Sequence, residues 1–139
     1  MKLLAMLKGR KKDNRPGEWG ETMAADYLEL GKYRILGRRV RLDNRSEIDI
    51  VAVKDNVLVF VEVKTRKTEL FGSPVESVKK SKKRTLSRAA VRYLKKLHFR
   101  PVYIRFDVVE VVGEEGGGEP VVRHIENAFP LDKRYTLPY

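Results

Sequence analysis

The sequence predicts an α/β protein with a mixed central β-sheet flanked by helices. The first observation is the order of the periodic patterns, which gives a helix, about three strands, a second helix and about two strands. The second is the run Val57–Val61, which is apolar on both faces, as is typical of a strand covered from both sides. The third is size, because 139 residues with 42% hydrophobic content can build one domain with a real core.

The first helix is expected over residues 16–30, after a basic N-terminal arm at residues 1–15. The arm either contacts phosphates or is a frayed terminus, and the sequence favours neither reading. Within the helix, apolar side chains recur at steps of three and four residues, at Trp19, Met23, Tyr27 and Leu30. Gly31 follows as a natural C-terminal stop.

Three strands are expected next. Residues 33–42 form the first strand, in which Gly37 indicates a bulge, and Asp43-Asn44 makes the turn that follows. Residues 46–66 form a β-hairpin, because two β-branched runs flank Asp55-Asn56, a pair suited to a tight turn.

The register of this hairpin predicts which side chains meet. A two-residue turn places Asp49 opposite Glu62, within side-chain contact. The same register places Glu47 opposite Lys64. The alternating positions, expected on the other face, are Ile48, Ile50, Val61 and Val63. A plainer alternative is that Glu47 and Lys64 form a cross-strand ion pair, while Asp49 and Glu62 merely occupy a polar edge.

The second helix is expected over residues 73–97. Its start is predicted from a capping box, in which Ser73 is the N-cap and Glu76 its partner, with Pro74 at the first helical position. Its apolar stripe runs through Val78, Leu86, Ala90, Tyr93, Leu94 and Leu97.

Two strands complete the predicted sheet. Residues 101–112 alternate as a strand, residues 113–119 form an acidic glycine-rich loop, and residues 121–125 form a short last strand that pairs back. Residues 16–130 are therefore expected to be a single α/β domain, followed by a tail at residues 131–139.

The charge balance points to a polyanionic partner. The chain carries 30 basic and 19 acidic residues, a net charge of +11, which favours nucleic acid ahead of an acidic membrane surface. Six bases crowd the first half of the second helix, at Lys79, Lys80, Lys82, Lys83, Arg84 and Arg88. Like charges one turn apart destabilise a helix, so we predict that this face contacts phosphates. The alternative is a solvated helix face.

Other chemistries find little support. The chain has no Cys, which excludes a disulfide or a thiolate metal site and fits a cytoplasmic protein. No stretch is long enough to span a membrane, and the apolar run near the N-terminus is too short for a secretory signal. His98 and His124 lack visible ligand partners and are expected at the surface or in structural roles.

Asp49 and Glu62 are candidate ligands for a hard cation such as Mg²⁺ or Mn²⁺, which typically takes one or two carboxylates and completes its shell with water and phosphate. Two carboxylates so close repel each other unless a cation or a proton lies between them. Lys64 lies two residues beyond Glu62, near enough to orient a water molecule and to stabilise developing charge on a phosphate. Glu18 and Glu21 suit the first turns of a helix through its dipole, and Glu21 is the preferred candidate to join the site.

Asp49, followed by Glu62-Val63-Lys64, resembles the PD-(D/E)xK nuclease motif in its Holliday-junction-resolvase-like branch. The whole chain more closely resembles the YraN family of small bacterial proteins. The matching stretches cover roughly residues 17–130 and keep the family order. They are Gly20-Glu21 with Ala24, Ala25, Tyr27 and Leu28; Glu47-Ile48-Asp49; Phe60–Arg66; Phe71-Gly72 with Pro74; Val78 and Lys82; Arg105-Phe106-Asp107; and Asn127-Ala128-Phe129.

The resemblance implies a restriction-endonuclease-like core and a set of roles. Asp49, Glu62 and the backbone carbonyl of Val63 would hold the metal ion. Lys64 would act on the water molecule, and Glu21 would be the acid that the resolvase branch carries on a helix. By analogy with resolvases, a homodimer is expected.

The leading functional hypothesis is a metal-dependent nuclease that hydrolyses phosphodiester bonds in branched or otherwise structured nucleic acid, with DNA favoured over RNA. The second is a nucleic-acid-binding adaptor of the same fold that does not cut. A third is a basic protein that binds ribosomes or acidic proteins.

Overall fold

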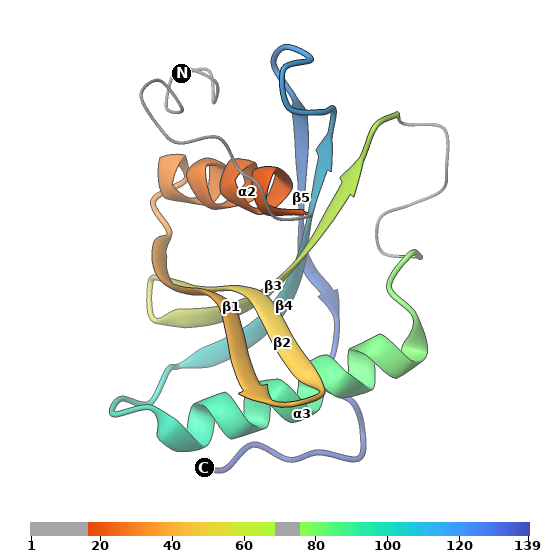
Figure 1. The fold of residues 1–139 in the computed structure, drawn as a ribbon. Coiled ribbons are helices and arrows are strands. Elements are labelled where there is room, and N and C mark those ends of the chain that lie inside the picture. Colours follow the sequence, from red (N-terminus) through yellow and green to blue (C-terminus); the bar gives the residue numbers. More distant parts are fainter. Residues whose placement is uncertain (1–16, 69–75) are drawn as a thin grey trace.

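Five strands form one mixed sheet, with a helix packed against each face (Figure 1). The computed structural model describes residues 17–68 and 76–139. The elements in chain order are α2 (Glu18–Leu30), β1 (Arg34–Asp43), β2 (Ser46–Lys54), β3 (Val57–Arg66), α3 (Lys80–Lys96), β4 (Tyr103–Val112) and β5 (Val121–Phe129). The predicted fold class is therefore confirmed, and the architecture is consistent with a restriction-endonuclease-like core.

The strands lie in the order β1-β2-β3-β4-β5. All neighbours are antiparallel except β3 and β4, which are parallel and are connected through α3. A parallel pair requires such a crossover, since its second strand must start at the same end of the sheet as the first. Figure 1 shows α2 and α3 on opposite sides of the sheet.

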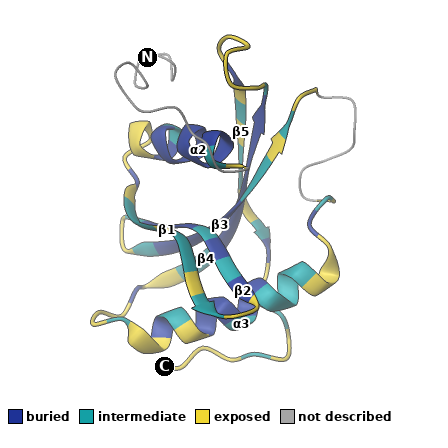
Figure 2. Ribbon diagram, in the orientation of Figure 1, coloured by how far each residue is buried: buried dark blue, intermediate teal, exposed yellow. Residues whose placement is uncertain are grey.

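The central strand β3 is buried from both sides, as predicted. Val59 and Val61 pack in the cluster that contains α2, while Leu58 and Phe60 pack in the cluster that contains α3. Burying one such side chain contributes about 1.5–3 kcal/mol, so β3 is a firm platform for the charged residues at its end. Figure 2 shows the buried middle of the sheet and the exposed outer side of α3.

Several local predictions are confirmed. The hairpin turns at Asp55-Asn56, whose φ angles of 51° and 64° are the positive values that a type I′ turn requires. The β1–β2 register shifts between Ile35 and Gly37, which is the expected bulge. The first helix begins at Glu18, and Gly31 is its C-cap.

The start of the second helix was predicted wrongly. The helix begins at Lys80 with Lys79 as its N-cap, and no side chain caps its first turn. Glu76 lies in a turn before the helix, while Ser73 and Pro74 lie outside the described residues. Val78 explains the later start, because it is buried in the α3 cluster from a position that precedes the helix. Tertiary packing therefore overrides a local capping signal here.

The last strand, β5, extends beyond the predicted residues 121–125 to Phe129. The sequence pattern did not indicate its second half because the backbone there is irregular. Its register with β4 shifts between Phe106 and Val108, and Asn127 has a φ of 52°. A bulge of this kind breaks the alternation of apolar residues but lets pairing continue to Phe129. No helix among the described residues is long and apolar enough to cross a membrane.

Candidate functional site

The hairpin brings Asp49 and Glu62 together. Backbone pairing of β2 and β3 follows the predicted register from Lys54↔Val57 to Ile50↔Val61. Just beyond this last pair, Asp49 Oδ2 accepts a hydrogen bond of 2.8 Å from the backbone N–H of Val63. The carboxyl groups of Asp49 and Glu62 lie close enough for each to shift the pKa of the other. The two predicted metal ligands are thus neighbours at the end of a buried strand.

Burial and mutual repulsion disfavour full ionisation of this carboxylate pair. Burial, and then the charge of Glu62, raises the pKa of Asp49 to about 7, against the hydrogen bond from Val63. Burial also raises the pKa of Glu62, although Lys82 and Lys64 oppose the shift. Two carboxylates held this close favour a shared proton or a bound cation over full ionisation.

Two lysines approach Glu62 from different elements. Lys64 Nζ, on β3 itself, lies 4.0 Å from Glu62 Oε1, and Lys82 Nζ, on α3, lies 3.8 Å from Oε2. The Oε2 atom is buried and makes no hydrogen bond to any residue that the structure describes. Lys82, which the sequence assigned only to the basic helix face, therefore reaches the carboxylate site.

Glu21 reaches the same site from α2. Its side chain is buried, and Glu21 Oε2 forms an ion pair with Arg39 Nε on β1 at 2.7 Å. Its charge raises the pKa of both Asp49 and Glu62, which indicates that the three carboxylates share one region. The structure thus places Glu21, Asp49, Glu62 and Lys64 together, as the sequence predicted.

The donor set fits a hard divalent cation better than zinc. The described residues contain no cluster of three or more His, Cys, Asp and Glu side chains arranged to hold a metal ion. Mg²⁺ does not need one, because it is usually bound through one or two carboxylates and keeps several waters. Asp49 and Glu62, with a Glu62 oxygen that makes no hydrogen bond, meet that requirement.

Two details of the hairpin differ from prediction. Glu47 pairs with Arg41 at 3.1 Å across the β1–β2 ladder instead of with Lys64. Ile48 packs in the α3 cluster, whereas Ile50 packs in the α2 cluster. The β2–β3 ladder ends at Ile50, so beyond it β2 follows β1 and no longer keeps the register with β3.

The basic face of α3 is partly neutralised within the chain. Arg84 lies 3.6 Å from Asp132, Arg88 lies 3.3 Å from Asp43, and Lys83 stands over the ring of Phe129. Lys79 and Lys80 are exposed. Of the six predicted nucleic-acid contacts, these two lysines are the most accessible.

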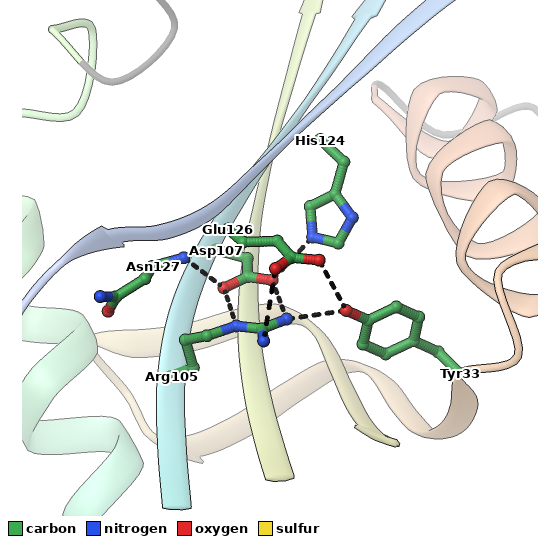
Figure 3. Close-up of polar contacts among 6 residues, drawn as sticks. All are labelled: Tyr33, Arg105, Asp107, His124, Glu126 and Asn127. Carbon is green, nitrogen blue, oxygen red and sulfur yellow. Dashed lines mark hydrogen bonds and ion pairs between the residues drawn. The ribbon is translucent and has the colours of Figure 1, made fainter. Parts of the chain in front are cut away.

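A second polar cluster, which we call the Asp107 cluster, was missed by the sequence reasoning (Figure 3). Its members come from β4, β5 and the residue just before β1: Tyr33, Arg105, Asp107, His124, Glu126 and Asn127. Asp107 has no exposed surface and accepts two 2.8 Å bonds from Arg105, one of 2.6 Å with His124 Nε2 and one of 3.0 Å from Asn127 N. The signal available in the sequence was an Arg and an Asp two residues apart on an apolar strand, which places them on one face.

Burial alone would raise the pKa of Asp107. The hydrogen bonds from His124, Arg105 and the Asn127 backbone outweigh burial and hold that pKa below its usual value. Arg105 also donates a 2.7 Å bond to the Tyr33 hydroxyl. His124 thus belongs to a buried network through its contact with Asp107.

Comparison with known proteins places the chain in a family. Residues 20–111 match the model of a family described as "Uncharacterised protein family UPF0102". A UPF0102 protein of Symbiobacterium thermophilum is 48% identical over 83% of this chain and 96% of its own length. The chain belongs to the UPF0102 family.

Other UPF0102 proteins agree with this assignment. One from Syntrophomonas wolfei is 46% identical over 81% of the chain and 96% of its own length, and one from Clostridium botulinum is 40% identical over 83% and 94%. The resemblance to the YraN family is thus confirmed. The UPF0102 match includes Glu21, Asp49, Glu62, Lys64 and Asp107, and it ends before His124.

Proposed function

We propose that this chain is a metal-dependent nuclease that hydrolyses phosphodiester bonds in nucleic acid, with structured or branched DNA as the first substrate to test. The observation that carries the proposal is the closeness of Asp49, bound to the backbone N–H of Val63, to the adjacent Glu62. Burial raises the pKa values of both carboxylates, and a divalent cation would relieve the repulsion between them. The net charge of +11 supports a phosphate-rich substrate.

The residues of the site would have different roles in the reaction. Asp49, Glu62 and the Val63 carbonyl would hold a Mg²⁺ or Mn²⁺ ion, which when bound supplies Lewis-acid polarisation of the phosphodiester. Lys64 Nζ, fixed beside Glu62, would orient the attacking water molecule and stabilise charge that develops on the phosphate. Glu21 would extend the acidic region from α2, with Arg39 holding its side chain in place.

Lys79 and Lys80 are the accessible cations that would hold the nucleic acid backbone, since both are exposed at the start of α3. Lys82 on the next turn contacts Glu62, so α3 would connect the phosphate-binding face with the carboxylate site. Contacts of this kind position the substrate without reading its sequence.

The experiment that tests the proposal is cleavage of a panel of labelled single-stranded, duplex and branched DNA by purified wild type, Asp49→Ala and Glu62→Ala, with Mg²⁺ or Mn²⁺. Losing the cation should cost about 4 kcal/mol of transition-state stabilisation, or about 1,000-fold in rate. Glu47→Ala is the matched control, because Glu47 lies on the same strand and only pairs with Arg41. Cleavage that persists in purified Asp49→Ala would refute the mechanism.

A second candidate is a nucleic-acid-binding adaptor that does not cut. The observation that favours it is that each carboxylate already has a partner inside the chain: Val63 N–H for Asp49, two lysines for Glu62 and Arg39 for Glu21. An adaptor would bind with an affinity that falls steeply with salt, would give no metal-dependent product and would bind equally well as Glu62→Ala. The same DNA panel, read for binding as well as for cleavage, separates the two candidates.

A further inference from the structure

A pocket of about 630 Å³ opens beside the Asp107 cluster. Its lining includes the side chains of Tyr27, Tyr33, Lys54, His124 and Glu126, together with apolar residues at the C-terminal end of α2 and on β5. The volume lies within the range of small-ligand sites, which combine an apolar lining with a few fixed polar groups. None of these residues belongs to the carboxylate site.

Three aromatic rings meet at this pocket. The centroids of Tyr33 and His124 lie 5.7 Å apart, and those of Tyr27 and His124 lie 6.2 Å apart, both in edge-to-face arrangements. Lys54 Nζ stands 5.2 Å from the centroid of the Tyr33 ring. Rings arranged in this way suit a flat aromatic ligand, and the ammonium group suits an anionic substituent on that ligand.

His124 lines the pocket, and only one of its two ring nitrogens, Nε2, is used in the contact with Asp107. Its Nε2 is bound to Asp107, its side chain is only 9% exposed, and Figure 3 shows its second nitrogen directed away from Asp107, on the side where α2 lies. The described residues give that second nitrogen no hydrogen-bond partner. When Nε2–H donates to Asp107, Nδ1 of the neutral ring is an acceptor, so a ligand here would donate to it.

Glu126 adds a second acceptor at the mouth of the pocket. Its side chain is 60% exposed, which allows solvent to screen its charge, and a carboxylate accepts hydrogen bonds from exocyclic amino groups of bases. Arg105 and Tyr33 hold Glu126 at 3.7 Å and 3.4 Å. The pocket therefore offers stacking surfaces, three acceptors at His124, Glu126 and Glu119, and one cation at Lys54.

We propose that this pocket binds a nucleotide whose unpaired base carries an exocyclic amino group. The base packs against the rings of Tyr27 and Tyr33, its amino edge faces His124, and its phosphate lies on the side of Lys54. The ligand is either one unpaired nucleotide of a strand or a free mononucleotide, which share this chemistry. The strand source rests on the proposed nuclease function, whereas the mononucleotide source does not.

The location suits the strand source. Glu21, which reaches the carboxylate site, lies in the first turn of α2, and Gly31, the C-cap of α2, lines the pocket. Ten helical residues span about 15 Å at 1.5 Å each. That distance corresponds to roughly four stacked nucleotides, so one strand could occupy both sites.

The test uses the protein's two histidines, which give two separate imidazole signals in long-range ¹H–¹⁵N spectra. Metal-free full-length protein in EDTA is titrated with a deoxyadenylate hexamer, a deoxythymidylate hexamer, deoxyadenosine monophosphate, deoxyribose phosphate and a blunt duplex. We expect the His124 signals to shift with the adenine-bearing ligands, while the signals of exposed His98 stay unchanged. Tighter binding of the hexamer identifies a strand, and equal binding identifies a free nucleotide.

Several results would overturn the assignment. They are no His124 shift with any adenine ligand, equal shifts with deoxythymidylate, equal shifts with deoxyribose phosphate, or shifts with the duplex alone. Because no metal is present, the result does not depend on cleavage. A His124 shift, together with no product in the separate DNA-cleavage assay with Mg²⁺ or Mn²⁺, would support the pocket and refute the nuclease. Cleavage in that assay without a His124 shift in the titration would support the nuclease and refute the pocket.

Tyr27→Ala supplies a second measurement, because Tyr27 is only partly buried and lies outside the Asp107 network. Losing one stacking ring should weaken adenylate binding about tenfold. Tyr103→Ala is the matched control, since Tyr103 is 68% exposed on β4 and does not line the pocket. Equal affinities of the two variants would contradict the stacking role.

Discussion

Asp49 and Asp107 are both carboxyl groups packed into the sheet, yet their surroundings shift the two pKa values in opposite directions. Asp107 receives bonds from Arg105, His124 and a backbone N–H, and its pKa is lowered. Asp49 receives one backbone N–H and faces Glu62, and its pKa is raised. Burial has the same sign at both positions, so the supply of hydrogen-bond donors and positive charge decides the outcome. The Asp107 carboxylate is fully hydrogen-bonded in its ionised form, whereas a cation or a proton would stabilise the pair of Asp49 and Glu62.

The largest expected effect is on stability at the Asp107 cluster. Asp107→Ala leaves Arg105 and His124 without their shared acceptor, which should lower the free energy of unfolding by about 3–5 kcal/mol. Asp49→Ala removes a repelled carboxylate and should cost far less. Urea unfolding of both variants checks the contrast, and equal losses would mean that the two sites do not differ as described.

A smaller effect is the dependence of stability on pH in metal-free buffer. The pKa of Asp49 is raised from 3.8 to about 7, so the folded state binds its proton more tightly and this contribution to stability falls as the pH rises from about 4 to 7. The pKa of Asp107 is lowered, so its contribution is present above its unfolded pKa of 3.8 and is lost as the pH falls below that value.

Asn variants should reveal these opposite slopes. Asp49→Asn should become steadily more stable relative to wild type as the pH rises from 4 to 8, because only wild type loses the proton that its folded state holds. The loss of stability of Asp107→Asn relative to wild type should instead become smaller as the pH falls toward 3. Urea midpoints across this range test both trends, and slopes of the same sign would contradict the comparison.

The smallest effect comes from adding the cation. At a Mg²⁺ or Mn²⁺ concentration of ten times Kd, binding to the folded state should stabilise wild type by about 1.4 kcal/mol. Asp49→Asn should gain little, because it keeps only one of the two carboxylates. Thermal unfolding with and without metal measures the difference, and an equal gain in both proteins would place the cation elsewhere.

The sequence predicted the hairpin well because its interactions are local. A two-residue turn fixes the register, and the period of two then places Asp49 beside Glu62. The bulge at Gly37 and the strand buried on both faces are likewise visible in neighbouring residues. Each of these features depends on side chains close together in the chain.

The features that were missed depend on contacts between distant elements. Lys82 reaches Glu62 only because the crossover lays α3 on the sheet, and no periodicity encodes that meeting. Tyr33, before β1, meets Arg105 on β4, and His124 on β5 meets Asp107 on β4. The bulge at Asn127 obscures the alternation along β5. Helix capping failed for the same reason, since burial of Val78 is a tertiary contact.

The edge position of β1 bears on self-association of the folded protein. An edge strand presents unpaired backbone groups to which a second copy could add. Four of the ten residues of β1 are Arg, at positions 34, 38, 39 and 41, and the strand is interrupted by register shifts near both ends. Like charges and bulges oppose strand-to-strand addition, so this edge is protected against the open-ended pairing that leads to aggregates.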